Sequence, residues 1–240
     1  MSTLFLVRHG QASFFSDNYD RLSDIGRVQA RRLARNWLAR GIRFGRVYTG
    51  PRQRQIDTAE EVGQIFRQAK VPWSDPVVLD ELDEYAAEQV LEQALPELIE
   101  TDARIRDLHA RVTAAETPAE KQRTFQRMYE VVMTKWASGE LPLKQVESWP
   151  DFRRRVHRGL DRIVSADRHG MRVAAFTSGG PVGVAVERAT RMPHEVTLRI
   201  AWMVRNGSSS QFLFSGERFT MSTFNALGHL DDDPTLLTYR

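Results

Sequence analysis

The amino-acid sequence predicts an α/β fold, a three-layer α/β/α sandwich built on a mostly parallel sheet. Short apolar runs alternate with amphipathic segments of helical periodicity along most of the chain, a pattern typical of parallel strands joined by helices. The runs contain few polar residues, as expected of strands that are covered on both faces. The chain has 240 residues, of which 41% are hydrophobic. We therefore expect a single domain that spans residues 1–240.

Two strand–helix units open the chain. Apolar residues recur at helical spacing after Ser23, a residue type that caps helix N-termini, and the periodicity stops at Gly41. A second helix follows an exit turn at residues 49–51. The predicted elements are a strand at residues 3–7, a helix between Ser23 and Gly41, a strand at 45–48 and a helix at 57–69.

A stretch of different character then interrupts the alternation. After a weak strand at residues 77–79, residues 86–146 carry three successive amphipathic helical sets, punctuated by Pro96, Pro118 and Gly139. We interpret residues 86–146 as a helical insertion within the domain, a cap that lies over one end of the sheet.

The alternation of strands and helices resumes after the insertion. A core strand is predicted at residues 172–177, and it leads directly into Ser178-Gly179-Gly180. The other predicted elements are helices near 152–163 and 182–191 and strands at 198–204, 209–214 and 218–224.

The charged residues favour a phosphorylated ligand over a nucleic acid. The formal net charge is +3, and 30 of the 34 basic residues are arginine. Arginine binds phosphate through a planar fork, although a coding-composition bias explains the same count. The one basic cluster, Arg153-Arg154-Arg155 with Arg158, spreads around a helix without interleaved aromatic residues. We interpret that cluster as a solvated face, and we expect no nucleic-acid partner.

The absence of cysteine limits both the chemistry and the compartment. A chain without cysteine has no disulfide, no thiolate metal site and no cysteine nucleophile. No apolar stretch approaches the roughly 18 residues of a membrane span, and no basic segment precedes the first apolar run. We expect a cytoplasmic protein without membrane contact, and the sequence leaves the oligomeric state open.

Three segments with phosphate-binding character follow predicted core strands. They are residues 8–10, residues 49–54 and residues 178–180. In α/β sheets, ligands bind outside the carboxyl ends of the strands, where loops and helix N-termini supply donors. We therefore expect Arg8, His9, Arg54 and Ser178 to converge around one phosphate.

These motifs, in this order, resemble the histidine phosphatase superfamily, the branch-1 group with the phosphoglycerate mutase-like fold. Residues 6–11 read LVRHGQ and are similar to the opening motif of that family. Residues 47–54 read VYTGPRQR and resemble its second motif, with the phosphate-binding arginine at Arg54. Leu79-Asp80-Glu81 is similar to the segment that carries the proton donor, and the matches span nearly the whole chain.

The resemblance implies a phosphohistidine mechanism without metal or cofactor. His9 would be the nucleophile, and Arg8 and Arg54 would hold the phosphoryl oxygens. Backbone amides near Gly10 and Gly179 would add donors. Glu81 is the first choice for the proton donor, and Glu84 and Asp83 are the alternatives.

The sequence departs from the family pattern after the late core strand. The family has Ser-His-Gly-Gly there, whereas this chain has Ser178 in the place of the second histidine. A smaller departure is Gln55, where alanine is commoner. We expect a phosphomonoester hydrolase of reduced activity that acts on a small phosphorylated substrate or a phosphorylated protein. The alternatives are a phosphate-binding protein with little or no activity and a phosphoglycerate mutase-type phosphotransferase.

Overall fold

The structure is a computed structural model that describes residues 1–13, 20–166 and 170–239. The chain divides into two compact units. One unit comprises Met1–Glu84 and Arg154–Arg240, and the other comprises Tyr85–Arg153. No helix among the described residues is both long enough and apolar enough to cross a lipid bilayer.

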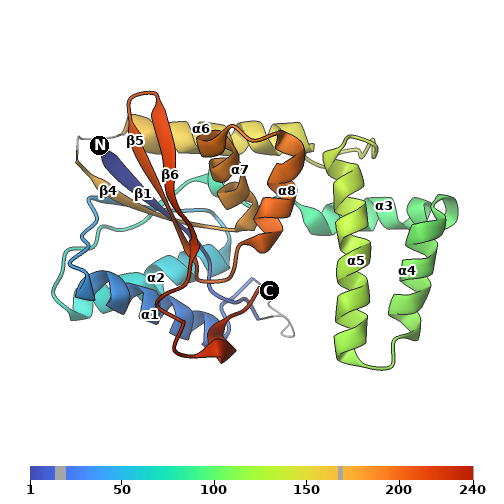
Figure 1. Cartoon of the computed structure of the whole chain (residues 1–240), viewed down its shortest axis with the longest axis horizontal. Helices are drawn as coiled ribbons and strands as arrows, with labels where there is room; N and C mark the ends of the chain where they lie inside the picture. The colour runs from blue at the N-terminus through green and yellow to red at the C-terminus, as the bar shows by residue number, and fades with distance from the viewer. Residues whose placement is uncertain (14–19, 167–169, 240) are drawn as a thin grey trace. The chain divides into compact units, whose positions relative to one another are not determined.

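The first unit is built on a six-stranded sheet with the strand order β3-β2-β4-β1-β5-β6 (Figure 1). The strands β3, β2, β4 and β1 pair in parallel, while β5 pairs antiparallel with both β1 and β6. The α/β class and the mostly parallel sheet are therefore confirmed. The strands are β1 (Ser2–Arg8), β2 (Arg46–Thr49), β3 (Val77–Val78), β4 (Arg172–Thr177), β5 (Ser209–Ser215) and β6 (Arg218–Ala226).

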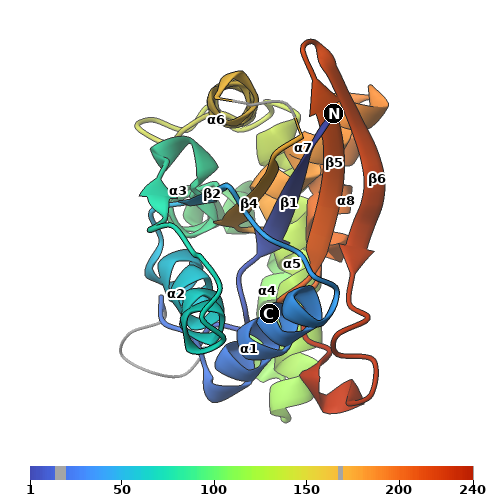
Figure 2. The same cartoon turned by 90° about the vertical axis from the view of Figure 1, so that its left-hand side faces the viewer.

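Helices flank this sheet on both sides. Helices α1 (Asp24–Ala39) and α2 (Gln53–Gln68) lie on one side, and α6 (Trp149–Ser165) and α7 (Gly179–Thr190) lie on the other (Figures 1 and 2). Ser23 is the N-cap of α1, and its side chain accepts a hydrogen bond from the Gly26 amide. Two short 3-10 helices, η1 (Asp80–Leu82) and η2 (Pro234–Leu236), complete the unit together with α8 (His194–Met203).

An aromatic cluster fixes α1 and α2 against the sheet. The ring centroids of Trp37 and Phe44 lie 4.7 Å apart, and those of Phe66 and Trp73 lie 4.9 Å apart. Phe176 of β4 lies 6.4 Å from Trp37 and is fully buried. Edge-on and tilted pairs of this kind add about 0.5 to 1.5 kcal/mol each beyond the burial of their area.

The second unit is helical. It contains α3 (Ala87–Thr101), α4 (Ala103–Ala114) and α5 (Pro118–Ala137). Pro118 occupies the first turn of α5, where a missing N–H costs nothing, whereas Pro96 lies inside α3 without ending it. That this insertion acts as a cap stays a prediction.

The predicted strand at residues 198–204 is wrong, because these residues belong to helix α8 and the loop after it. Leu198 and Ala201 are buried, and the chain approaches α7 closely at Gly183. A Cβ at Gly183 would lie 2.9 Å from the Thr197 carbonyl oxygen. Packing against α7 therefore decides the conformation of a segment whose composition alone favours a strand.

Backbone-to-backbone packing joins the exit of β1 to the start of α1. A Cβ at Gly10 would lie 2.4 Å from the Gly26 carbonyl oxygen, and a Cβ at Gly26 would lie 2.2 Å from the Gln11 carbonyl oxygen. Neither neighbour is a flexible side chain that can move aside. Only glycine fits at these two positions.

We predict that Gly26→Ala destabilises the protein by roughly 2 kcal/mol, because the added methyl group must separate α1 from the loop after β1. The measurement is chemical denaturation followed by circular dichroism. Gly228→Ala is the matched control, since its nearest atom, Asp231 Oδ2, lies at 3.7 Å. The control should stay within about 0.5 kcal/mol of the wild type. Equal stabilities of the two variants would contradict the packing argument.

Candidate active site

The candidate site lies at the carboxyl ends of four neighbouring parallel strands. Arg8, the last residue of β1, pairs with Thr177 of β4, and the His9 amide donates to the Thr177 carbonyl at 2.8 Å. On the other side of β4, the Gly50 amide donates to the Phe176 carbonyl at 2.9 Å. The Leu79 amide likewise donates to the Thr49 carbonyl at 2.8 Å. The loops after β1, β2, β3 and β4 therefore meet at one edge of the sheet.

His9 is buried, with 5% of its surface exposed, and its ring is held in one tautomer. Its Nδ1 lies 2.7 Å from the Gly10 carbonyl oxygen, which can only accept a hydrogen bond, so Nδ1 carries the proton. Nε2 then holds a lone pair, and it accepts a hydrogen bond from Arg54 Nε at 3.1 Å. Burial, followed by the charges of Arg54 and Arg8, lowers the pKa of His9 well below its usual value. The ring is neutral at physiological pH.

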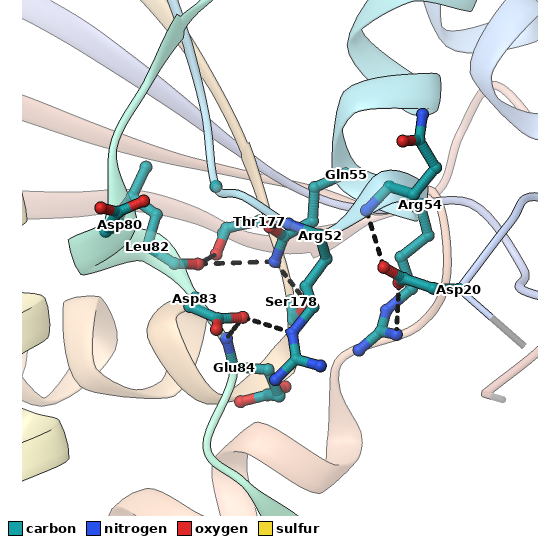
Figure 3. A network of polar contacts seen from close by, with 12 residues as sticks. Asp20, Arg52, Arg54, Gln55, Asp80, Leu82, Asp83, Glu84, Thr177 and Ser178 are labelled. Carbon is teal, nitrogen blue, oxygen red and sulfur yellow. Dashed lines mark hydrogen bonds and ion pairs between the residues drawn. The ribbon is translucent and has the colours of Figure 1, made fainter.

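Two arginines approach from different strand ends. Arg54 lies in the first turn of α2, its side chain is 11% exposed, and its Nη1 also contacts Asp20 Oδ1 at 2.8 Å (Figure 3). Arg8 follows from β1, and its Nη1 donates to the Val204 carbonyl. The predicted partners His9 and Arg54 are thus in direct contact.

Thr58 joins the first two motifs and engages the Gly10 amide. Its hydroxyl accepts from the Gly10 N–H at 3.1 Å and donates to the Arg54 carbonyl at 2.6 Å. The Gly10 N–H, expected as a phosphate donor, is therefore used inside the protein. The Gly10 carbonyl instead accepts the hydrogen bond that fixes the His9 ring. The absence of a side chain at Gly10 also allows the close approach to Gly26.

Ser178 precedes α7 and is almost completely buried. Its hydroxyl oxygen accepts a hydrogen bond from Gln55 Nε2 at 2.8 Å. The Gly180 amide in the first turn of α7 donates to both carboxylate oxygens of Glu84, at 3.1 and 3.0 Å. A Cβ at Gly179 would lie 2.8 Å from the Ala201 carbonyl oxygen. Glycine therefore lets the start of α7 approach α8 closely.

Glu81 and Glu84 have different surroundings. Arg162 Nη1 lies 2.8 and 2.9 Å from the two carboxylate oxygens of Glu81. Burial, the largest single effect, raises the pKa of Glu81, but the hydrogen bond from Arg162, a backbone hydrogen bond and the charges of Arg162 and Arg158 together lower the net pKa. A lowered pKa is the wrong direction for a group that must hold a proton near neutral pH. Glu84, and not Glu81, is the carboxylate at the start of α7.

Two arginines hold the segment that carries Glu84. Arg52 Nε contacts Asp83 Oδ1 at 2.6 Å (Figure 3). Arg155, expected to lie on a solvated helix face, instead donates to backbone carbonyls of this segment. Its Nη1 reaches the carbonyl oxygens of Asp80, Glu81 and Asp83 at 3.1, 3.2 and 3.1 Å.

A signal in the sequence could have identified Glu84. The tripeptide Leu-Asp-Glu occurs twice in succession, at residues 79–81 and 82–84. Either copy matches a short pattern, and only the backbone path through η1 decides which carboxylate reaches the start of α7. No comparable pattern identifies Gln55 or Thr58, because their roles depend on contacts between separate loops.

The arrangement combines the groups that phosphoryl transfer requires. A neutral imidazole presents one lone pair, guanidinium groups supply positive charge, and a carboxylate and a hydroxyl lie at the start of α7. Phosphoryl transfer depends mainly on positioning a nucleophile and stabilising charge on the phosphoryl oxygens. These are the groups that binding a phosphate and accepting it on nitrogen would require.

Comparison with known families agrees with this chemistry. A model described as the histidine phosphatase superfamily (branch 1) matches residues 4–90 and 85–227. The chain belongs to this superfamily. A comparison with curated proteins gives no match.

Solved structures show the same fold at low sequence identity. A putative alpha-ribazole-5'-P phosphatase from Escherichia coli is 19% identical, with a TM-score of 0.62, over 95% of this chain and 100% of that one. A phosphoserine phosphatase mutant from Entamoeba histolytica is 14% identical, with a TM-score of 0.63, over 96% and 100%. A phosphoglycerate mutase from Bacillus anthracis is 18% identical, with a TM-score of 0.63, over 95% of both chains. The fold is therefore phosphoglycerate mutase-like.

The burial of His9 makes the stability of the protein depend on pH. The pKa of His9 is lowered in the folded state, so between pH 6.5 and that pKa the unfolded chain binds a proton that the folded chain does not. Stability therefore rises with pH in this window and is lost on acidification.

We predict that the free energy of unfolding falls as the pH drops from 6.5 to 5, with a contribution from His9 that approaches about 1.4 kcal/mol per pH unit. His9→Gln removes this contribution, so its unfolding free energy should depend less steeply on pH. Urea denaturation of both proteins at several pH values measures the difference. Parallel curves would show that the His9 ring is not held neutral.

Proposed function

We propose that this chain is a phosphomonoester hydrolase that works through a phosphohistidine on His9. The observation that carries this proposal is the state of the His9 ring. Its proton is fixed on Nδ1 by the Gly10 carbonyl, and Nε2 presents a lone pair beside Arg54. A nucleophilic nitrogen next to a guanidinium group is the arrangement that phosphoryl transfer to histidine needs.

In the first step, Nε2 of His9 attacks the phosphorus atom and the ester P–O bond breaks. Arg8 and Arg54 stabilise the charge on the phosphoryl oxygens, which are more strongly bound as charge spreads onto them. The oxygen of the leaving alcohol takes a proton from Glu84.

In the second step, the Glu84 carboxylate takes a proton from water and the water oxygen attacks the phosphorus. The N–P bond breaks, its electron pair returns to Nε2, and orthophosphate leaves. No step requires a metal or a cofactor. Glu84 replaces our first choice, Glu81, because Arg162 neutralises Glu81 and its pKa is lowered.

Ser178 is the reason to propose a reduced rate. A second imidazole, when protonated, would donate a charge-assisted hydrogen bond to the phosphate, and a serine hydroxyl donates a neutral one. The difference of about 1 to 3 kcal/mol corresponds to a rate roughly fivefold to 160-fold lower. The same residue supports the alternative of a phosphate-binding protein with almost no turnover. Phosphotransfer of the mutase type requires only that the phosphoryl group return to a substrate before water arrives.

The substrate class that fits is a small phosphorylated molecule. The structural relatives include enzymes named for phosphoserine and alpha-ribazole phosphate, and they support this class without selecting a member of it. The cytoplasmic location stays a prediction.

We predict that His9→Ala abolishes turnover of p-nitrophenyl phosphate and the acid-labile phosphoenzyme, because the attacking lone pair in the proposed mechanism belongs to His9. The phosphoenzyme is trapped by an alkaline quench and measured by phosphorus NMR at alkaline pH. Arg54→Ala should retain a trace of the phosphoenzyme and lose on the order of 10² to 10³ in rate. Wild-type activity in His9→Ala would exclude this nucleophile.

We predict that Glu84→Gln lowers kcat/KM, which reports the first step alone, far more for an alkyl phosphate than for an aryl phosphate, by roughly 10² or more against less than tenfold. An alkoxide leaves only with a proton, whereas a nitrophenolate leaves without one. Glu81→Gln is the matched control, and its kcat/KM should change less than about threefold for either substrate. The opposite ranking of the two variants would return the proton-donor role to Glu81.

A further inference from the structure

Gln55 is a fully buried side chain at the junction of three strand-end loops, and the proposed mechanism does not use it. Its Oε1 accepts from the Arg52 amide, after β2, at 3.1 Å. Its Nε2 donates to Ser178 Oγ, after β4, at 2.8 Å and approaches the Leu82 carbonyl, after β3, at 3.4 Å (Figure 3). One amide therefore connects the loops after β2, β3 and β4.

The contacts of Gln55 fix which end of the amide faces Ser178. The Arg52 N–H can only donate, so the atom facing it is the amide oxygen. The Leu82 carbonyl can only accept, so the atom facing it is the amide nitrogen. If the amide were flipped, its NH₂ group would face the Arg52 N–H, donor against donor, and its oxygen would face the Leu82 carbonyl, acceptor against acceptor. The group that meets Ser178 is therefore an N–H donor.

This orientation determines what the Ser178 hydroxyl can do. Because an amide NH₂ only donates, Ser178 Oγ is the acceptor in this hydrogen bond and keeps its own proton for another acceptor. In the part of the chain that the structure describes, the hydroxyl takes part in that one hydrogen bond. A buried hydroxyl proton without an acceptor costs free energy until a ligand supplies one.

Helix α7 does not use the hydroxyl either. Serine at the N-cap position normally accepts a hydrogen bond from an amide in the first turn. Ser178 occupies that position without making this bond. The Gly180 amide donates to the Glu84 carboxylate instead. The serine oxygen therefore faces Gln55, while the carboxylate covers the helix end.

We propose that Gln55 is a positioning residue that turns the Ser178 hydroxyl into a fixed donor to a phosphoryl oxygen of the bound substrate. This inference rests on the proposed phosphate site. Ser178 lies one residue beyond Thr177, whose carbonyl accepts the His9 amide, so the hydroxyl belongs to the same strand end as the nucleophile. A donor already oriented before binding loses no rotational freedom when the phosphate arrives.

The experiment measures the affinity of the full chain for inorganic vanadate and inorganic phosphate by calorimetry, together with kcat and KM for p-nitrophenyl phosphate. The variants are Ser178→Ala, Gln55→Met and the double variant. Methionine keeps much of the volume of glutamine and removes its donor. Thr177→Val is the matched control, because it removes a 2.7 Å bond to the same Leu82 carbonyl without touching Ser178.

We expect Ser178→Ala to weaken vanadate binding roughly ten- to hundredfold, the effect of losing a hydrogen bond to a charged group. Gln55→Met should weaken it about two- to tenfold, since the hydroxyl then rotates freely. In the Ser178→Ala background, Gln55→Met should have no further effect. Thr177→Val should change the vanadate affinity equally in the wild type and in the Ser178→Ala background. In Ser178→Ala and Gln55→Met, kcat should fall by a larger factor than KM rises.

Additive effects of Gln55→Met and Ser178→Ala would overturn the inference, because Gln55 would then act through the loops alone. Unchanged vanadate affinity in Ser178→Ala would overturn it as well, and so would a wild-type chain that binds neither anion. If the wild type shows no turnover but the affinity losses of Ser178→Ala and Gln55→Met are coupled, the hydrolase proposal is rejected and the role of Gln55 is supported. If the wild type shows turnover but the two affinity losses are additive, the hydrolase proposal is supported and the role of Gln55 is rejected.

Discussion

The position of β4 between β1 and β2 is the constraint on which the candidate site depends. β4 pairs in parallel with both neighbours, so the chain after Thr177 emerges between the loops that carry His9 and Arg54. Its residues 173–177 are almost completely buried, as a strand covered on both faces requires. Parallel strands expose all their carboxyl ends at one edge, and residues 8 and 178 meet there although the chain between them is long.

The charges at this edge are balanced by short contacts within the first unit. Asp20 faces Arg54, Asp83 faces Arg52, and Arg162 faces Glu81. His9 stays neutral among these groups because it is buried beside two guanidiniums. A neutral ring is a nucleophile and a charged one is not, so in the proposed mechanism the positive charges that would attract phosphate also keep the His9 ring unprotonated.

The sequence predicts the fold well because its evidence is local and repeated. Apolar strands followed by capped helices determine the class, and residues 3–7, 45–48 and 172–177 lie within or overlap strands β1, β2 and β4. The misassigned segment 198–204 depends on packing against α7, and the choice between Glu81 and Glu84 depends on the path through η1. Gln55 and Arg155 act across loops that are distant in sequence. Such contacts leave no periodicity, so the sequence alone cannot identify them.

Gln55 and Ser178, the two residues at which we expect a departure from the family pattern, contact each other directly. Gln55 Nε2 lies 2.8 Å from Ser178 Oγ, so a histidine ring at position 178 that pointed the same way as the hydroxyl would overlap the Gln55 amide. Conversely, an alanine at position 55 beside a serine at 178 would leave a buried hydroxyl without its donor and a gap between the loops after β2, β3 and β4. Each residue therefore limits which side chain fits at the other position, and the proposed neutral donor depends on both residues.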